Sequence, residues 1–378
     1  MQVAIPKEVA SGERRVALVP EVLPKLSAKG VDVVVESGAG AAALFDDAAY
    51  EEKGARIAHD ATALYENAAI TCRVQPPTIS EAALLPEGSA LASFLQPASD
   101  LGLLQVLVSR RITAFSLDLL PRISRAQAMD ALSSQATVSG YRAGLMGAEM
   151  LPRFFPLFMT AAGTVPPAKV LVLGAGVAGL QAIATARRLG AVVRAYDVRP
   201  AARDEVKSLG ASFVELELEA QEGQGGYAKE QSEDFLARQR ELIGKEVAMA
   251  DVVITTAAIP LRTAPVLVTT AMVEQMGPGC VLIDLAAESG GNCEASRPGE
   301  DVRVGHVTVR GVHNLPSEMP THASFLYARN MAELLGLLVS EGELAPDFED
   351  EIVSGTCVTH AGEVRHGPTR ELIERGTT

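Results

Sequence analysis

The feature that most constrains this chain is a glycine-rich turn set between an apolar run and a helical run. Residues 169–173 (Lys-Val-Leu-Val-Leu) are typical of a buried strand, and the next six residues read Gly-Ala-Gly-Val-Ala-Gly. A helical stretch through Arg188 follows, and a second apolar run, Val192 to Tyr196, ends at Asp197. This order of strand, Gly-x-Gly-x-x-Gly turn, helix, strand and acid predicts a dinucleotide-binding βαβ unit.

Each part of this pattern predicts one contact with a dinucleotide. Gly174 permits the tight turn, Gly176 lets the backbone approach a pyrophosphate, and Gly179 lets the helix pack closely on the strand. The helix N-terminus offers N–H groups and a partial positive charge to the phosphates. Asp197 lies 18 residues beyond Gly179, where an acid accepts hydrogen bonds from the adenosine ribose and repels a 2′-phosphate. The pattern therefore favours NAD over NADP.

Alternatives to this interpretation are open at the level of sequence. A Gly-x-Gly-x-x-Gly pattern alone can be an ordinary glycine-rich turn, but the strand, helix, second strand and acid in one register favour nucleotide binding. Arg194 and Arg199 lie close enough to Asp197 to weaken the preference for NAD slightly. We predict that NAD(H) is contacted by these residues of the fingerprint: Gly174, Ala175, Gly176, Val177, Ala178, Gly179, Asp197, Val198 and Arg199.

Length and composition bound the fold and the partners. A chain of 378 residues is expected to form two or three domains. Apolar residues make up 48% and aromatic residues 4%, and Trp is absent, so the core is expected to consist of Ala, Val and Leu. Such cores are typical of helices packed on parallel sheets. The net charge of −14 argues against non-specific binding to nucleic acid.

Cysteine and histidine spacing indicates neither a disulfide framework nor a metal site. No Cys-x-x-Cys pair occurs, which suits reduced thiols in a cytosolic protein. Residues 1–20 are charged and lack the apolar run of a signal peptide, and no apolar stretch reaches 18 residues. We therefore expect a soluble chain without a metal. The residues considered are Cys72, Cys280, Cys293, Cys357, His306, His313, His322 and His360.

Strand and helix patterns alternate along the chain. Apolar runs near residues 2–5, 31–36, 69–74, 89–95 and 113–117 predict strands with helices between them, which favours a doubly wound parallel sheet. Further runs at 213–214, 251–255, 280–284 and 307–310 extend the glycine-containing half. Residues 130–150 predict a helix that crosses between domains, and 323–341 predict a helix that returns to the first domain, followed by a polar tail.

We thus predict an α/β fold with two doubly wound, parallel-sheet, Rossmann-like domains, the second inserted in the first. The expected boundaries are 1–135 plus 320–378 for the N-terminal domain and 136–319 for the NAD(H)-binding domain. The acidic, glycine-rich stretch 215–232 is expected to be an exposed mobile loop, in which Tyr227 could be incidental.

Several segments together resemble the family of alanine dehydrogenases and proton-translocating nicotinamide nucleotide transhydrogenases. They are spread in family order over most of the chain. They comprise residues 6–8 with 13–20, the glycine fingerprint, 282–293 and 311–317.

The two branches of this family differ in chemistry. In the alanine dehydrogenase branch an Arg binds the substrate carboxylate, and a Lys and a His serve imine chemistry, which requires proton transfer. Arg15 matches the Arg, but Gln75 and Gln96 stand at the positions of the Lys and the His, and Glu288 at that of an active-site Asp. Because neutral amides cannot shuttle protons, the resemblance argues against imine chemistry.

Direct hydride transfer between two nicotinamide rings needs positioning rather than an acid or a base. The loop 122–135 resembles the transhydrogenase loop that holds the nicotinamide, which implies catalytic positioning roles for Arg122, Gln127, Asp130 and Ser133. The alternative is that Asp130 and Ser133 cap a helix and that Arg122 faces solvent.

Two further segments carry cofactor contacts implied by the resemblance. Residues 225–229 resemble the mobile loop whose Tyr, here Tyr227, closes over the nucleotide. Residues 255–260 resemble the turn beneath the cofactor, which implies contacts by Thr256, Ala257 and Ala258, although the family commonly has Leu where this chain has Ala258. Glu288 is assigned to the same cofactor site.

The resemblance implies the NAD(H)-binding alpha subunit of a Si/Re-specific, proton-translocating NAD(P) transhydrogenase. NADP(H) would then be held by a separate beta subunit, and protons would pass through that subunit and a membrane-spanning alpha2-type subunit. The chain would form a homodimer and lie on the cytoplasmic face of the membrane. Two other hypotheses stay open: an NAD-dependent amino-acid dehydrogenase of the alanine type, and a nucleotide-binding protein without chemistry.

Overall fold

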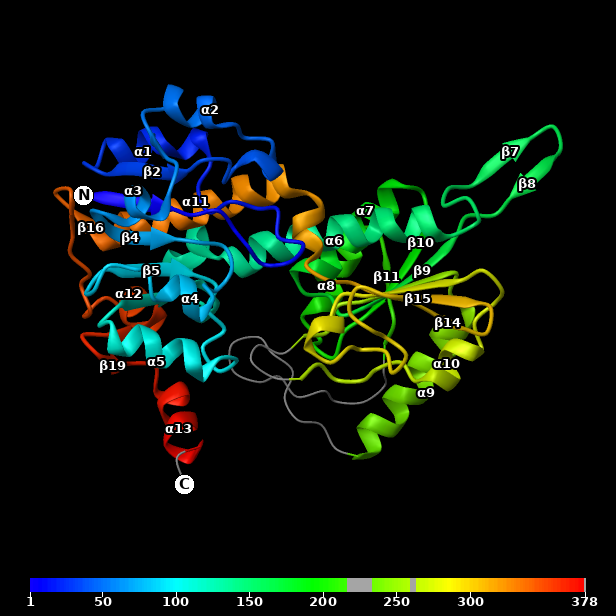
Figure 1. The fold of residues 1–378 in the computed structure, drawn as a ribbon. Helices are drawn as coiled ribbons and strands as arrows, with labels where there is room; N and C mark the ends of the chain where they lie inside the picture. Colours follow the sequence, from blue (N-terminus) through cyan, green and yellow to red (C-terminus); the bar gives the residue numbers. More distant parts are fainter. Residues whose placement is uncertain (216–232, 259–262, 377–378) are drawn as a thin grey trace. The chain divides into compact units, whose positions relative to one another are not determined.

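The computed structural model describes residues 1–215, 233–258 and 263–376 (Figure 1). The chain forms two compact units, each built around its own sheet. The first unit contains residues 1–135 and 317–378, and the second contains residues 136–316. The second unit is therefore inserted in the sequence of the first.

The sheet of the first unit has eight strands among the described residues, in the order β19-β18-β6-β5-β4-β1-β2-β3. Strands β1 to β6 pair in parallel, and β18 and β19 add an antiparallel edge. The strands are β1 (Gln2–Ile5), β2 (Asp32–Glu36), β3 (Arg56–Ala58), β4 (Ala68–Cys72), β5 (Ala90–Ser93), β6 (Thr113–Ser116), β18 (Cys357–His360) and β19 (Glu363–Val364).

Both faces of this sheet are buried, because side chains alternate between two cores. Val3 and Ile5 of β1 pack in one core with α11 (Pro320–Leu338), whereas Ala4 packs in the other with α5 (Leu101–Ser109). This arrangement explains the nearly continuous apolar runs in the sequence. The other helices are α1 (Leu23–Ser27), α2 (Asp47–Glu52), α3 (Ala61–Tyr65), α4 (Ile79–Ala82), α12 (Glu351–Thr356) and α13 (Gly367–Gly376).

The sequence after residue 341 predicts only a polar tail, and in the structure this tail forms strands and helices as far as Gly376. Strand β18 pairs antiparallel with β6, and Cys357 and Val358 are buried. A small antiparallel pair, β16 (Val339–Ser340) with β17 (Glu343–Leu344), precedes it. Each of these segments is short, so few apolar residues mark it, and the partner strand of β18 lies more than 200 residues away in sequence.

The second unit has a seven-stranded sheet in the order β11-β10-β9-β12-β13-β15-β14, counted over its described residues. All pairs are parallel except β14–β15 at one edge. The strands are β9 (Lys169–Leu173), β10 (Val192–Tyr196), β11 (Ser212–Phe213), β12 (Val252–Thr255), β13 (Val281–Asp284), β14 (Asp301–Val304) and β15 (Val307–Gly311).

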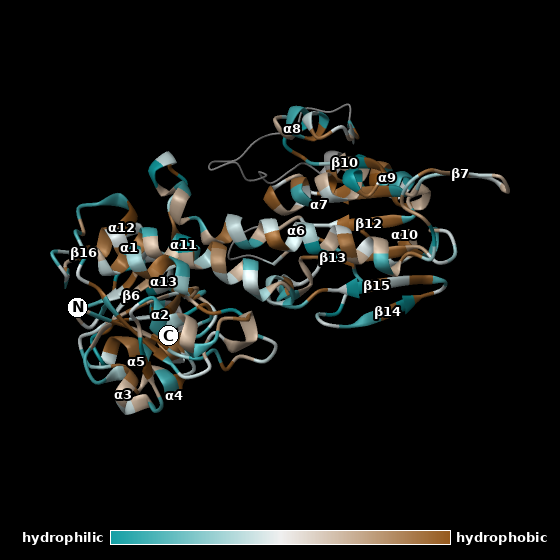
Figure 2. Ribbon diagram, turned by 90° about the horizontal axis from the view of Figure 1, so that it is seen from above, coloured by the Kyte–Doolittle hydropathy of each residue, from teal (hydrophilic) through white to brown (hydrophobic). Residues whose placement is uncertain are grey.

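Helices cover both faces of this sheet as well, and Figure 2 shows apolar residues along the central strand β12. Val170 and Val172 of β9 pack with residues of α6 and α7, and Leu171 packs with residues of α9. The predicted α/β class with two doubly wound parallel sheets is confirmed. The helices are α6 (Ala131–Met150, which begins in the first unit), α7 (Val177–Arg188), α8 (Ala202–Ser208), α9 (Glu233–Met249) and α10 (Thr270–Glu274).

The second unit also carries an exposed hairpin, which the sequence did not indicate. Strands β7 (Phe158–Thr160) and β8 (Gly163–Val165) pair antiparallel (Figure 1). All their residues are exposed. Within the described residues of the chain, none of the helices combines the length and the apolar character needed to cross a lipid bilayer.

Candidate functional site: a dinucleotide site on the second unit

The second sheet reverses its winding between β9 and β12, which are neighbours although β10 and β11 follow β9 in sequence. In doubly wound sheets, ligands bind outside the carboxyl ends of the strands at this switch point. The glycine turn follows β9 there, and Thr256 follows β12 at the same edge.

The structure shows a separate reason for glycine at each of the three fingerprint positions. Gly174 has φ of +100°, and a Cβ on it would lie 2.6 Å from Thr256 Oγ1. A Cβ on Gly179 would lie 1.9 Å from the carbonyl oxygen of Gly174, so helix and turn could not approach as they do. A Cβ on Gly176 would meet no atom within 4 Å. Gly174 and Gly179 thus allow close packing, and Gly176 faces open space.

Helix α7 begins at this open space. Gly176 is its N-cap residue and supplies no side-chain cap, so the first-turn N–H groups of Val177, Ala178 and Gly179 have no acceptor within the helix. Val177 is exposed and Ala178 is half-buried. A helix of 12 residues with an open, glycine-lined N-terminus fits the phosphates of a dinucleotide.

Asp197, directly after β10, lies against the glycine turn. Its Oδ2 accepts a hydrogen bond from the N–H of Ala175 at 2.7 Å. Its Oδ1 accepts the N–H of Arg199 at 2.8 Å, and the Arg199 guanidinium donates to both oxygens at 3.0 Å. Val198, between them, is half-buried. The turn after β10 and the turn after β9 are thus joined through one carboxylate.

The turn after β12 is held by a buried asparagine. Thr256 Oγ1 donates to the carbonyl of Gly174 at 3.1 Å. The side chain of Asn292 accepts from the N–H of Ala257 at 2.9 Å and donates to its carbonyl at 2.8 Å. Ala258 is exposed. This double contact fixes the backbone of the turn at the switch point.

Asn292 is in turn positioned by Asp284 at the end of β13. The fully buried Asp284 carboxylate accepts four hydrogen bonds: from the N–H groups of Ala286, Asn292 and Cys293 and from Thr255 Oγ1, at 2.9–3.1 Å. No sequence motif predicted a role for Asp284 or Asn292. The available signal was a pair of polar residues following a buried strand.

Glu288, a predicted cofactor contact, lies on a short turn after β13. Its carboxylate pairs with Nδ1 of His313 at 2.8 Å and accepts the N–H of Asn314 at 3.0 Å. The side chains of Glu288 and His313 are about half exposed. Tyr227 lies outside the described residues.

The predicted nicotinamide loop belongs to the first unit. Arg122 and Gln127 are exposed, and Gln127 lies in a 3-10 turn over Ser124–Met129. Asp130 accepts the N–H of Ser133 at 2.9 Å and its Oγ at 2.6 Å, so these two residues cap the start of α6. The capping alternative is therefore present in the structure, and the cap fixes the two side chains at the end of the loop.

Arg15 matches the carboxylate-binding Arg of the alanine dehydrogenase branch, and it is buried in an ion-pair network of the first unit. Arg15 donates to both Glu13 oxygens at 2.8 and 2.6 Å and to the Gln135 side chain at 2.9 Å. Gln75 and Ser317 also donate to Glu13, at 2.8 and 2.5 Å. Burial opposes ionisation of Glu13, but the hydrogen bonds and charge of Arg15, with the hydrogen bonds of Ser317 and Gln75, hold its pKa well below 4.5.

Gln96, the second amide, is not a member of this network. It has φ of +43° and is exposed, and its N–H donates to Asp118 at 2.9 Å. All four cysteines are buried and free. No cluster of His, Cys, Asp and Glu suited to a metal ion occurs among the residues that the structure describes.

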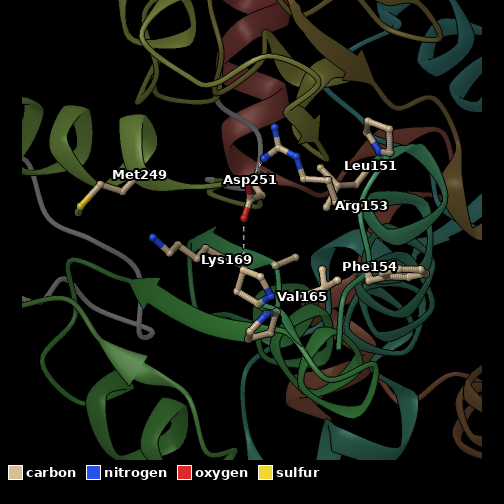
Figure 3. Close-up of a pocket in the computed structure, with 11 residues that line it drawn as sticks. Leu151, Arg153, Phe154, Val165, Lys169, Met249 and Asp251 are labelled. Atoms are coloured by element: carbon tan, nitrogen blue, oxygen red, sulfur yellow. Dashed lines mark hydrogen bonds and ion pairs between the residues drawn. The ribbon is translucent and has the colours of Figure 1, made fainter. Parts of the chain in front are cut away.

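An open groove of 860 Å³ lies at the opposite end of the second sheet (Figure 3). It is lined by Lys169 at the start of β9 and by Asp251 just before β12, so it is not the switch-point site. Arg153 also lines the groove. Its guanidinium pairs with Asp251 and donates to the Pro278 carbonyl at 2.6 Å. Phe154, also in its lining, is 56% exposed.

Comparisons with known proteins match this arrangement over nearly the whole chain. A protein of Rhodospirillum rubrum, named as the first portion of an NAD(P) transhydrogenase subunit alpha, is 48% identical over 97% of this chain and 98% of its own length. The crystal structure of a transhydrogenase from Sinorhizobium meliloti has a TM-score of 0.88 at 42% identity, covering 96% of this chain and all of that one. An L-alanine dehydrogenase structure has a TM-score of 0.84 at 25% identity, covering 99% of each chain.

Two family models confirm the resemblance. The model described as "Alanine dehydrogenase/PNT, N-terminal domain" matches residues 4–139, and "Alanine dehydrogenase/PNT, C-terminal domain" matches residues 143–367. Together they span most of the chain and meet near the start of its second unit. The chain therefore belongs to the alanine dehydrogenase/PNT family.

Proposed function

We propose that this chain is the NAD(H)-binding alpha component of an NAD(P) transhydrogenase. The observation that carries the proposal is the side chain of Gln75, at the position that the dehydrogenase branch fills with a Lys. Its amide donates to the buried carboxylate of Glu13 and neither gains nor loses a proton at neutral pH. A site of this kind suits direct hydride transfer, which needs no acid or base. The 48% identity to a transhydrogenase subunit supports the same assignment.

In this proposal the switch-point residues hold NAD(H), which supplies or accepts the hydride when bound. The first-turn N–H groups of α7 bind the pyrophosphate, and the open space at Gly176 admits it. Asp197 accepts hydrogen bonds from the adenosine ribose. The turn at Ala257, held by Asn292, supports the nicotinamide side of the dinucleotide.

We assign the nicotinamide-positioning role to the loop of the first unit that contains Arg122, Gln127, Asp130 and Ser133. Exposure of Arg122 and Gln127 leaves both side chains accessible to a ligand, and the cap formed by Asp130 and Ser133 gives the loop a fixed end. Tyr227, Ala258 and Glu288 stay in the proposed cofactor site on the family resemblance. We also propose that the two domains have the predicted ranges, 1–135 plus 320–378 and 136–319, with the second boundary three residues beyond that of the compact units.

The proposal also includes the partner subunits of this chain and its location in the cell. The name of the Rhodospirillum rubrum relative describes one portion of a subunit, which supports a complex of several chains. We propose an NADP(H)-binding beta subunit, a membrane-spanning alpha2-type subunit, Si/Re-specific transfer coupled to proton movement, and a place on the cytoplasmic face of the membrane. A homodimer is supported by the exposed hairpin, where Phe158 and Met159 are 40% and 78% exposed.

The decisive experiment mixes this chain with the NADP(H)-binding component of a transhydrogenase complex. We expect NADH to reduce a spectrally shifted NADP⁺ analogue only when both proteins are present. A parallel assay follows NADH oxidation with pyruvate and ammonia, for which we expect no turnover. Turnover there would favour an alanine-type dehydrogenase. NADH binding without activity in either assay would favour a nucleotide-binding protein without chemistry.

A further inference from the structure

The Asp197 carboxylate has no acceptor position left for a ribose. A carboxylate offers about four lone-pair positions. Two accept backbone N–H groups, from Ala175 and Arg199, and two accept Nε and Nη2 of the Arg199 guanidinium. The side chain of Asp197 is only 8% exposed, so water contributes little to the hydrogen bonding of this carboxylate.

The two pairs of donors are not equally replaceable. The N–H groups of Ala175 and Arg199 belong to the turns after β9 and β10, and removing either would require those turns to move. The guanidinium is carried on a rotatable side chain that is 26% exposed. An adenosine ribose presents two hydroxyl donors, the same number as the guanidinium uses.

We propose that Arg199 is a gate on the ribose-binding carboxylate. Its guanidinium occupies the two acceptor positions that the ribose hydroxyls require, and it leaves Asp197 when a dinucleotide binds. This inference rests on the proposed NAD(H) site. It changes the role of Arg199 from a cofactor contact, as expected from the sequence, to a competitor of the cofactor.

The gate lowers the affinity for NADH by the free energy needed to break the ion pair. A partly exposed pair of this kind is worth about a fivefold change in an equilibrium constant. Arg199→Ala is therefore expected to bind NADH about fivefold more tightly than the unmodified chain. Loss of a positive charge acts in the opposite direction on an anionic ligand, so a charge control is needed.

Arg194→Ala is the matched control. Arg194 lies on β10, five residues before Arg199, pairs with Glu246 at 2.7 Å and is 48% exposed. Its loss therefore removes the same charge from a nearby position and leaves every hydrogen bond to Asp197 in place. Arg199→Lys gives a second test, because it keeps the charge and loses the two-pronged contact. We expect the order of NADH affinity to be Arg199→Ala, then Arg199→Lys, then the unmodified chain and Arg194→Ala.

The measurement is calorimetric titration with NADH and with its 2′-deoxyadenosine analogue. The advantage of Arg199→Ala should shrink with the analogue, which presents one hydroxyl fewer to Asp197. An affinity in Arg199→Ala equal to or below that of Arg194→Ala would overturn the gate while the NAD(H) site stands. Failure of the unmodified chain to bind NADH would overturn the proposed function together with the gate.

Discussion

Replacing Asp284 with Asn tests whether the buried carboxylate at the end of β13 organises the switch-point site. Each Asp284 oxygen accepts two hydrogen bonds: Oδ1 from Thr255 Oγ1 and the N–H of Ala286, and Oδ2 from the N–H groups of Asn292 and Cys293. An amide has one oxygen. Whichever way it is turned, at least one buried N–H group loses its acceptor.

The favourable orientation keeps the oxygen toward Asn292 and Cys293 and leaves the N–H of Ala286 without an acceptor. A stranded buried N–H costs about 1–3 kcal/mol. The two retained hydrogen bonds change from charge-assisted to neutral, which costs about 1 kcal/mol each. Removing a buried charge offsets some of this loss. We therefore expect Asp284→Asn to lower the free energy of unfolding by about 2–4 kcal/mol.

Urea unfolding followed by circular dichroism measures this change, since the chain contains no Trp for fluorescence. Thr255→Val is the control, because it removes a single hydroxyl donor to Asp284 and should cost about 0.5–1.5 kcal/mol. If Asp284→Asn were no less stable than Thr255→Val, the carboxylate would not be the organising group.

Three further outcomes are expected. Gly140→Ala should lower the free energy of unfolding by about 1–3 kcal/mol, because its Cβ would lie 2.1 Å from a backbone carbonyl oxygen of α7. The control is Gly244→Ala, which should be neutral or stabilising because its Cβ would meet no atom nearer than 3.7 Å. Equal effects of the two substitutions would contradict this packing argument. Because the pKa of Glu13 is lowered in the folded chain, its pairing with Arg15 stabilises the fold above pH 4.5, and this stability is lost as pH falls below that value. Glu13→Gln should flatten that acid-induced loss in unfolding experiments; an unchanged pH profile would show that another group causes it. Gln127→Asn should slow hydride transfer far more than it weakens NADH binding, and equal losses would indicate a residue that only holds the cofactor.

Residues close in sequence allowed the dinucleotide site to be predicted. Gly174 has a positive φ, and a Cβ on Gly179 would lie 1.9 Å from the Gly174 carbonyl oxygen. Both requirements for glycine arise within one strand–turn–helix unit, so the spacing of the two residues can be read from the sequence. Asp197 follows the next strand and reaches the same turn through Ala175. Parallel pairing of β9 with β10 brings these positions together in any such unit.

Other features of the site depend on the path of the whole chain. Asn292 holds Ala257 across 35 residues of sequence, and the strand after residue 356 pairs with β6. Neither contact leaves a periodic signal, because sequence periodicity reports only neighbours within a turn of helix or along one strand. The capping of α6 by Asp130 is a contact between neighbours in sequence, so it could be predicted as an alternative. The function of the loop 122–135 depends instead on the ligand that it binds.

By itself, the sequence determined the α/β class and the glycine turn, because these follow from side-chain alternation and from backbone angles that only glycine adopts readily. The tertiary structure decided which polar groups share a site. Glu13 meets Ser317 across 304 residues, and Asp284 gathers four donors from three separate segments. A buried charge is stable only where folding supplies its partners, and the chain order alone does not specify those partners.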